Sequence, residues 1–398
     1  MKRVIQASVI LALLVVESGF TQVVVRKAGS DKTSLSLSKF TAGKGGAELF
    51  FRTLENDLKR SGWFVLTETA ATIEVGGSCS EAGGRVSAVC RAANRLTGKE
   101  YVNKTYAGES SEVRRLAHQA ADDIIFAVTG LRGISGTRIA MVGFRNGRKD
   151  IYVCDADGAN LVQITREGLP CLAPAWSRDA NALFYTAFLS GFPDVYRIDL
   201  ASRRRTRVAA FAGLNTGAAV SPDGNRLALV LSKDGNPELY VMHLGTGELV
   251  RLTRTRHATE ASPSWSQDGT QIVFVSNRAG TPQLYVITST GGQERRLTLR
   301  GSQNMAPDWG PNGLIAYSSL RGGCFQICVA DAAGEREQLT FDYANHEDPS
   351  WAPDGRHIVY ARGTGYRYTL YILDTKGDPE VPLTNIEGSW YSPAWSPR

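Results

Sequence analysis

From Thr137 to its C-terminus the sequence copies itself about every 44 residues, and this repeat limits the possible folds more than any other feature. Three markers recur in phase through six copies. The first is an aromatic residue in a predicted strand, found at Tyr152, Tyr196, Tyr240, Tyr285 and Tyr371, with Ile327 in the fifth copy. The second is the Thr that ends a copy, found at Thr165, Thr253, Thr298, Thr340 and Thr384, with Ala209 in the second copy. The third is a Trp before a turn, found at Trp176, Trp265, Trp309, Trp351 and Trp395, with Val220 in its place once.

Each copy is predicted to form four short strands. The Trp strand leads into a turn of the SPDG kind, in which Pro fixes φ, Asp caps the turn and Gly takes a positive φ. The segments that follow, such as LALVL at 227–231 and QIVFV at 271–275, are apolar on both faces. A strand has this composition when both of its faces are covered, as they are between stacked blades. The repeat therefore predicts an all-β, six-bladed β-propeller over residues 138–398.

The two ends of the repeat region complement each other. The first copy begins at Arg138 without a Trp strand, and the chain ends on an unmatched Trp strand, SPAWSPR at 392–398. We therefore predict that the ring is closed by strand exchange between its ends. An open solenoid or a pair of sandwiches is the alternative, but it leaves the matching gap and extra strand unexplained. The fifth copy is shorter than the others, and we place the missing residues near Arg321.

Residues 20–130 contain no repeat and predict a separate α+β domain. Alternating strand segments surround two amphipathic helices, which the apolar spacing places at 47–61 and 112–128. The second helix is expected to end at Gly130. A short linker, residues 131–137, joins this domain to the propeller.

The first residues predict export. Lys2 and Arg3 precede an apolar stretch from Val4 to Val16, and small polar residues follow, which is the order of a secretory signal peptide over residues 1–19. The alternative, a membrane anchor, requires a longer uninterrupted apolar run. No second run of spanning length follows. We therefore expect a mature periplasmic protein without a transmembrane segment.

Neither the charge nor the cysteine content of the chain indicates a nucleic-acid site or a zinc site. The formal net charge is +6, and the one dense basic cluster, residues 203–207, is read as a solvated turn rather than a nucleic-acid contact. Disulfides could persist in an exported chain, but the sequence does not give the pairing of the six cysteines, Cys79, Cys90, Cys154, Cys171, Cys324 and Cys328. The chain has no CxxC pair with a nearby His, so zinc is disfavoured.

The combined motifs resemble the TolB family. HQAADDIIFAVTGLRGISGTRIAMV at 118–142 is similar to that family's domain junction, and the PAWS, LYV and closing SPAWSP motifs are similar to its blades. The resemblance implies a periplasmic component of the Tol-Pal system that supports outer-membrane integrity and cell division. It further implies binding of the peptidoglycan-associated lipoprotein at the propeller mouth, of TolA by the mature N-terminal segment, and possible binding of other outer-membrane proteins.

Two sets of residues are candidates for protein contacts. Loops that run from the end of one copy to the next Trp strand should open on one propeller face, and the only loop insertion, before Trp265, lies among them. The mouth candidates are Asn215, Thr216, His257, Thr259, Glu260, Ser302, Gln303, Asn304, His346, Glu347, Trp390 and Tyr391. The N-terminal candidates are Thr21, Gln22, Val23, Val24, Val25, Arg26 and Lys27, which alternate enough to add to a sheet edge.

Catalytic signatures are lacking. The chain has no GxSxG, HExxH, GxGxxG or Walker pattern, and we expect neither catalysis nor a cofactor. The alternative is a lyase-type propeller enzyme with a metal or a histidine base, His257 or His346, in the mouth. The DADG turn at 155–158 is similar in part to a calcium loop, but it lacks the acid at the twelfth position.

Overall fold

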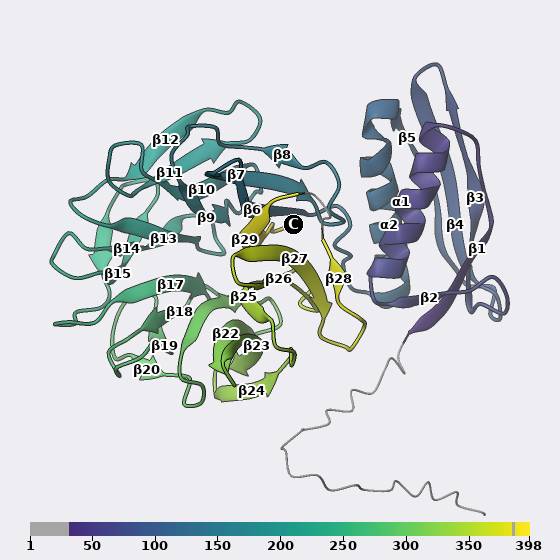
Figure 1. Ribbon diagram of the computed structural model, residues 1–398. Helices are drawn as coiled ribbons and strands as arrows, with labels where there is room; N and C mark the ends of the chain where they lie inside the picture. Colours follow the sequence, from purple (N-terminus) through teal and green to yellow (C-terminus); the bar gives the residue numbers. More distant parts are fainter. Residues whose placement is uncertain (1–31, 384–386) are drawn as a thin grey trace, which may run out of the picture.

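The computed structural model describes residues 32–383 and 387–398, which form two domains lying side by side (Figure 1). The first is an α+β domain, and the second is a ring of six four-stranded sheets. Both predicted fold classes are confirmed. The predicted signal peptide and the N-terminal candidates, Thr21–Lys27, lie outside the described residues.

The N-terminal domain is a five-stranded sheet with two helices on one face. Its strand order is β2-β1-β3-β4-β5, with β1 parallel to both neighbours and the other pairs antiparallel. The helices lie between this sheet and the propeller (Figure 1). The elements are β1 (Thr33–Ala42), α1 (Gly46–Arg60), β2 (Phe64–Leu66), β3 (Ile73–Ala82), β4 (Arg85–Asn94), β5 (Glu100–Glu109), a 3₁₀ turn (Ser110–Glu112) and α2 (Val113–Thr129).

Both helices form where the apolar spacing places them. In α1, Phe50, Leu54 and Leu58 lie on one side and are fully buried in the core of this domain. Helix α2 ends at Gly130, which takes the left-handed conformation, with φ 75°, that glycine adopts at low cost.

The six blades follow the repeat. Blade 1 contains β6 (Arg138–Arg145), β7 (Arg148–Asp155) and β8 (Val162–Gln163), together with the last strand, β29 (Ser389–Trp395). Blade 2 contains β9 (Cys171–Trp176), β10 (Ala182–Ala187), β11 (Asp194–Asp199) and β12 (Arg205–Ala209), and blade 3 contains β13 (Asn215–Val220), β14 (Arg226–Leu231), β15 (Glu238–His243) and β16 (Leu249–Arg251). Blade 4 contains β17 (Glu260–Trp265), β18 (Gln271–Ser276), β19 (Gln283–Thr288) and β20 (Arg295–Arg296), and blade 5 contains β21 (Asn304–Trp309), β22 (Ile315–Arg321), β23 (Cys324–Asp331) and β24 (Gly334–Gln338). Blade 6 contains β25 (Asn345–Trp351), β26 (His357–Thr364), β27 (Arg367–Asp374) and β28 (Val381–Pro382).

The last strand closes the ring. Strand β29 pairs antiparallel with β6, so that Trp395 lies opposite Ile139 and Ser389 opposite Phe144. The indole N–H of Trp395 donates to Thr137 Oγ1 over 2.8 Å, which also fixes the linker. The C-terminal strand thus supplies the inner strand that the first copy lacks.

Every inner strand carries a bulge at the same place. The bulge residue has a positive φ, and the six bulge residues are Ala173, Gly217, Ser262, Ala306, Asp348 and Ser392. The pairing register with the second strand shifts around each of them. These residues line a central channel of about 570 Å³.

The fifth repeat corrects two expectations. Cys328, not Ile327, occupies the aromatic position, because Cys328 lies opposite Tyr317 just as Tyr285 lies opposite Phe274. The hairpin between β22 and β23, which contains Arg321, is as long as the hairpin between β18 and β19 in blade 4. One missing residue instead belongs to the turn after Trp309, because Trp309 pairs with Ile315 whereas Trp265 pairs with Ile272.

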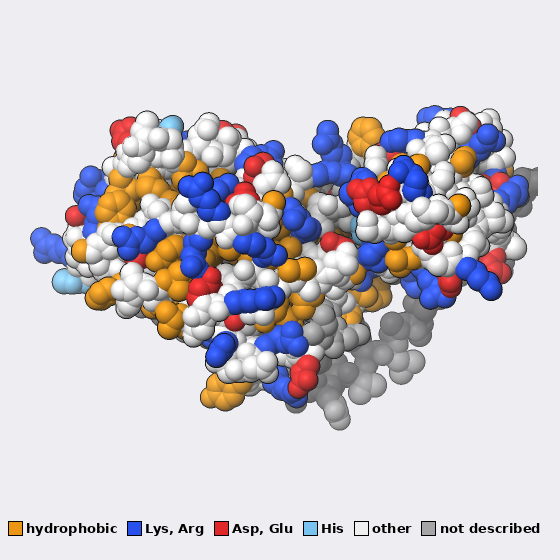
Figure 2. All heavy atoms as spheres, turned by 90° about the horizontal axis from the view of Figure 1, so that it is seen from above, with side chains coloured by type: hydrophobic (Ala, Val, Ile, Leu, Met, Phe, Trp, Pro, Cys, Tyr) orange, Lys and Arg blue, Asp and Glu red, His pale blue; other side chains and the backbone are white. Residues whose placement is uncertain are grey.

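All six cysteines lie in the described part of the chain and are free there, and all except Cys324 are buried. The basic cluster, residues 203–207, lies in the turn before β12 and on the first residues of β12, and all of it is exposed. Seen from above, Lys and Arg side chains are spread among hydrophobic and acidic ones instead of forming one broad basic face (Figure 2). Among the described helices, none is both long and apolar enough to cross a membrane.

Candidate protein-binding site

The rim is the propeller edge at which the six inner strands begin. Antiparallel pairing brings to this edge the loops that lead into the inner strands and the hairpins that join second to third strands. Every described mouth candidate lies in these loops or at the start of an inner strand. The rim is therefore one surface assembled from all six blades.

Burial divides the mouth candidates into two groups. Five are at most 1% exposed and offer no side-chain surface to a partner, which corrects their assignment as contacts: Asn215, Glu260, Asn304, His346 and Trp390. All five stand five residues before the Trp position of their inner strand. The sequence pattern predicts loops at these positions, whereas in the structure their side chains pack between neighbouring blades.

Trp390 illustrates the reason. Its ring packs edge-on against Tyr152, with ring centroids 5.2 Å apart and planes at 84°. Gly143 leaves the space for it, because a Cβ there would meet the Trp390 ring at 2.6 Å. Trp390 is therefore a core residue at the boundary of blades 1 and 6.

The remaining candidates lie at the surface. His257, Thr259 and Ser302 are exposed. The others are partly exposed, and these are Thr216, Gln303, Glu347 and Tyr391. Glu347 accepts a hydrogen bond from Tyr368 Oη over 3.1 Å, and Tyr391 donates to the carbonyl of Tyr366 over 2.9 Å, so both side chains are held in place.

The structure adds apolar residues that the sequence reading missed. Large hydrophobic side chains are exposed along the rim loops and hairpins, at Phe144, Leu169, Phe192, Phe211, Leu299, Met305, Phe341, Tyr343 and Tyr366. Tyr343 is 91% exposed. Bulky apolar residues inside otherwise polar turns are the signal that could have found them. Large apolar side chains exposed on the loops of a rigid scaffold are candidate anchors for a protein partner.

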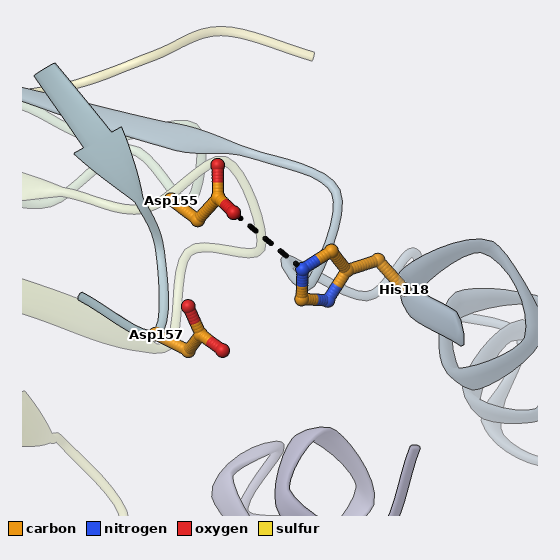
Figure 3. Close-up of side chains that lie close together, drawn as sticks. All are labelled: His118, Asp155 and Asp157. Carbon is orange, nitrogen blue, oxygen red and sulfur yellow. Dashed lines mark ion pairs between the residues drawn. The ribbon is translucent and has the colours of Figure 1, made fainter. Parts of the chain in front are cut away.

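The opposite edge of the propeller holds the N-terminal domain. Asp155 and Asp157, from the DADG turn of blade 1, point toward His118 of α2 (Figure 3). His118 Nε2 lies 3.9 Å from Asp155 Oδ2, and its Nδ1 lies 2.6 Å from Asp57 Oδ2 of α1. Arg114 of α2 forms an ion pair with Asp157.

These charges compensate one another. Burial would lower the pKa of His118, but the carboxylates of Asp155 and Asp57 outweigh that effect and raise it to about 9. The geometry of His118, Asp155 and Asp157 would suit a metal ion, yet protein cations already engage these carboxylates. We read the cluster as an electrostatic link between the domains.

A second buried link joins the domains at blade 6. Arg356 donates to Asp374 over 2.7 Å and to the carbonyl of Gly62 over 2.7 Å. Its guanidinium also stacks 4.3 Å from the ring centre of Trp63. Between the two links lies an interdomain cavity of about 860 Å³, whose lining includes Arg60, Asp157 and Asp374.

The histidines of the lyase alternative are not brought together. His346 is buried against Tyr360, and burial lowers its pKa. His257 is exposed on the loop into blade 4, and blade 5 separates the two. This arrangement does not assemble a histidine pair in the mouth.

Comparison with known proteins gives the family. A profile described as the TolB beta propeller domain matches residues 126–398. The Tol-Pal system protein TolB of Bordetella avium is 31% identical over 391 residues, which cover 93% of this chain and 88% of that protein. The chain is a member of the TolB family. That of Gluconobacter oxydans is 29% identical over 408 residues, which cover 96% of this chain and 89% of its own.

The likeness to TolB includes both domains. The crystal structure of TolB from Acinetobacter baumannii superposes with a TM-score of 0.82 at 26% identity, and the match covers 92% of this chain and 97% of that one. The N-terminal α+β domain therefore belongs to the shared TolB fold together with the propeller.

Proposed function

We propose that this protein is a non-catalytic, periplasmic component of a Tol-Pal envelope system that supports outer-membrane integrity and cell division. The observation that carries the proposal is the near full-length likeness to the Tol-Pal system protein TolB of Bordetella avium. In this proposal the rim binds the peptidoglycan-associated lipoprotein. The N-terminal segment, residues 21–27, binds TolA, and other outer-membrane proteins are further candidate partners.

The composition of the rim supports a protein partner. Exposed apolar groups such as Tyr343, Phe341 and Leu299 stand beside polar groups such as Gln303 and Glu347. Aromatic residues on a rigid scaffold supply contact area at low entropic cost, and few of them carry most of the binding energy. We therefore place the lipoprotein over this face.

The binding experiment compares two faces of the propeller. Purified protein is titrated with the lipoprotein, and the double variant Phe341→Ala, Tyr343→Ala should weaken binding by at least about tenfold, since two exposed anchors are removed. The matched control is Arg203→Ala, on the turn before β12 at the opposite edge, and it should bind normally. Normal binding by the rim variant together with loss of binding by the control would refute the proposed face.

The N-terminal proposal has its own test. Residues 21–27 precede β1, and main-chain pairing of such a segment with a sheet edge gives affinity largely independent of side chains. A chain beginning at Ser30 should lose TolA binding and keep lipoprotein binding. Undiminished capture of TolA by this shorter chain would contradict the assignment.

Absence of catalysis is part of the proposal. The purified protein should turn over no peptide, ester or polyuronate, with or without added calcium or zinc. Metal-dependent turnover that is lost on changing His257 would instead favour the lyase alternative.

A further inference from the structure

Three successive blade boundaries, from blade 2 to blade 5, are joined at the rim by one repeated contact. The residue five positions before the Trp donates its backbone N–H to a proline carbonyl of the preceding blade, as Asn215 does to Pro193 over 3.1 Å. Glu260 makes the same bond to Pro237 over 3.0 Å, and Asn304 makes it to Pro282 over 2.9 Å. Each of these side chains consequently faces the residue that follows the proline.

In two of these contacts an amide bridges the blades. Asn215 Nδ2 donates to Asp194 Oδ1 over 3.4 Å, and Asn304 Nδ2 donates to Gln283 Oε1 over 2.8 Å. Between blades 3 and 4 the corresponding residues are Glu238 and Glu260. Both of these side chains are carboxyl groups, the charge of Glu238 acts on Glu260, and neither group offers an N–H.

The two carboxyl groups differ in their surroundings. Within the described structure, Glu238 accepts hydrogen bonds from Asn236, Arg251, Thr253 and Thr255. Glu260 Oε1 accepts from Arg278 over 3.0 Å and from Ser276 over 3.2 Å. Glu260 Oε2 is buried and has no hydrogen-bond partner among the described residues.

We propose that Glu260 carries a proton in the folded protein and donates it to Glu238, and that this proton regulates the rim at the boundary of blades 3 and 4. The proton supplies the hydrogen bond that Asn supplies at the two neighbouring positions. The regulatory part rests on the proposed function, because it assumes that the rim binds the lipoprotein.

The charges around the pair are consistent with this assignment. Burial raises the pKa of Glu260 to about 7, although Arg278 and Ser276 act in the opposite direction, and Glu238 raises it further. Glu294 lies 3.4 Å from Arg278 and shares its charge. On the side of blade 3, Arg251 pairs with both Glu238 and Asp234.

The pair lies under the longest rim loop, residues 254–259. Thr255 donates to Glu238 through its backbone N–H, and Asn236 donates to both Glu238 and the carbonyl of Ala258. A second negative charge next to Glu238 would therefore act on the bonds that hold this loop. Two of its exposed residues, His257 and Thr259, are among the candidate contacts.

Stability against pH gives the direct test. The folded-state pKa is raised from 4.5 to about 7, so the stability contribution of the protonated group is complete below about pH 4.5 and is lost as pH rises through about 7. Glu260→Gln keeps the shape and offers a permanent N–H. Its melting temperature should match that of the wild type at low pH and exceed it by several degrees at about pH 8.

Two matched measurements guard against a misfolded variant. Glu238→Gln places at this boundary the residue found at Gln283 and removes the neighbouring charge that raises the pKa of Glu260, so the loss of stability should move to lower pH. Infrared spectra of the wild-type protein at about pH 6 should contain a protonated-carboxyl band that is absent from Glu260→Gln. Identical pH profiles for the wild type and Glu260→Gln, without such a band, would overturn the proposal.

Lipoprotein binding separates this inference from the proposed function. Wild-type affinity should be weaker at about pH 8 than at about pH 6, and the affinity of Glu260→Gln should change less. Equal wild-type affinity at both pH values overturns the regulatory part. Absence of binding at either pH refutes the proposed function, while the melting curves and the infrared band still decide where the proton lies.

Discussion

At the scale of single residues, Trp390 shows that a residue beside a loop in the sequence can be buried in the fold. Trp390 is the second residue of β29 and comes directly after a loop, yet its side chain packs in the apolar cluster between blades 1 and 6. An aromatic residue so placed stabilises the propeller and cannot anchor a partner.

Replacing Trp390 with Ala should therefore reduce the free energy of unfolding by about 3–5 kcal/mol, because the change leaves a cavity beside Tyr152. Urea denaturation measures this effect. Tyr343→Ala, at a 91% exposed position, is the control and should change stability by less than about 0.5 kcal/mol. A Trp390→Ala variant as stable as the wild type would contradict the observed packing.

His118 makes the junction between the domains sensitive to pH in a separate window. Its folded-state pKa is raised from 6.5 to about 9, so its contribution is complete below about pH 6.5 and is lost as pH rises through about 9. His118→Asn should remove this part of the profile, worth at most about 3 kcal/mol. Thermal melts from about pH 6 to 10 check it. If His118→Asn loses stability over the same pH range as the wild type, a group other than His118 is responsible for the loss.

At the scale of elements, ring closure depends on one strand from the far end of the chain. Strand β29 hydrogen-bonds to β6 and contributes Trp390 and Trp395 to the core of blade 1. Each blade rests on two neighbours, so an incomplete blade exposes a strand edge and two apolar faces at once.

Deleting residues 392–398 should lower the melting temperature of the whole propeller instead of fraying a tail. Scanning calorimetry should show the main transition shifted by about 10 °C or more, since the loss exceeds that of a single core residue. Arg203→Ala serves as the control and should melt like the wild type. An unchanged main transition after the deletion would argue against closure by β29.

At the scale of the whole molecule, two buried charge clusters fix the N-terminal domain on blades 1 and 6. Asp155 meets His118 in one, and Arg356 meets Asp374 and Gly62 in the other. Both clusters lie on the edge opposite the rim, so they hold the N-terminal domain away from the rim.

Arg356→Ala should loosen this connection. Removing the cation leaves Asp374 buried without its main partner, which costs about 3–5 kcal/mol. Calorimetry should resolve two transitions for Arg356→Ala and one for the wild type, and small-angle scattering should show a larger radius of gyration for the variant. A single transition and an unchanged radius would mean that the His118 cluster suffices to hold the domains.

The sequence by itself determined the architecture, because the information is local and repeated. The phase of Trp, Tyr and Thr fixes the strands and turns of each blade, and the missing and extra Trp strands reveal closure by β29. Helix spacing and Gly130 placed α1 and α2 for the same reason.

Only the tertiary structure decided which side chains are available. Asn215, Glu260 and Trp390 are loop residues by pattern, but contacts with the preceding or the first blade bury them. The pairing register of β22 and β23, which the sequence alone does not give, places Cys328 at the aromatic position of the repeat. Asp155 and His118 belong to different domains, and their charges meet only after both have folded. Burial and long-range electrostatics depend on neighbours that are distant in sequence, which is why the repeat predicts the ring but not its binding surface.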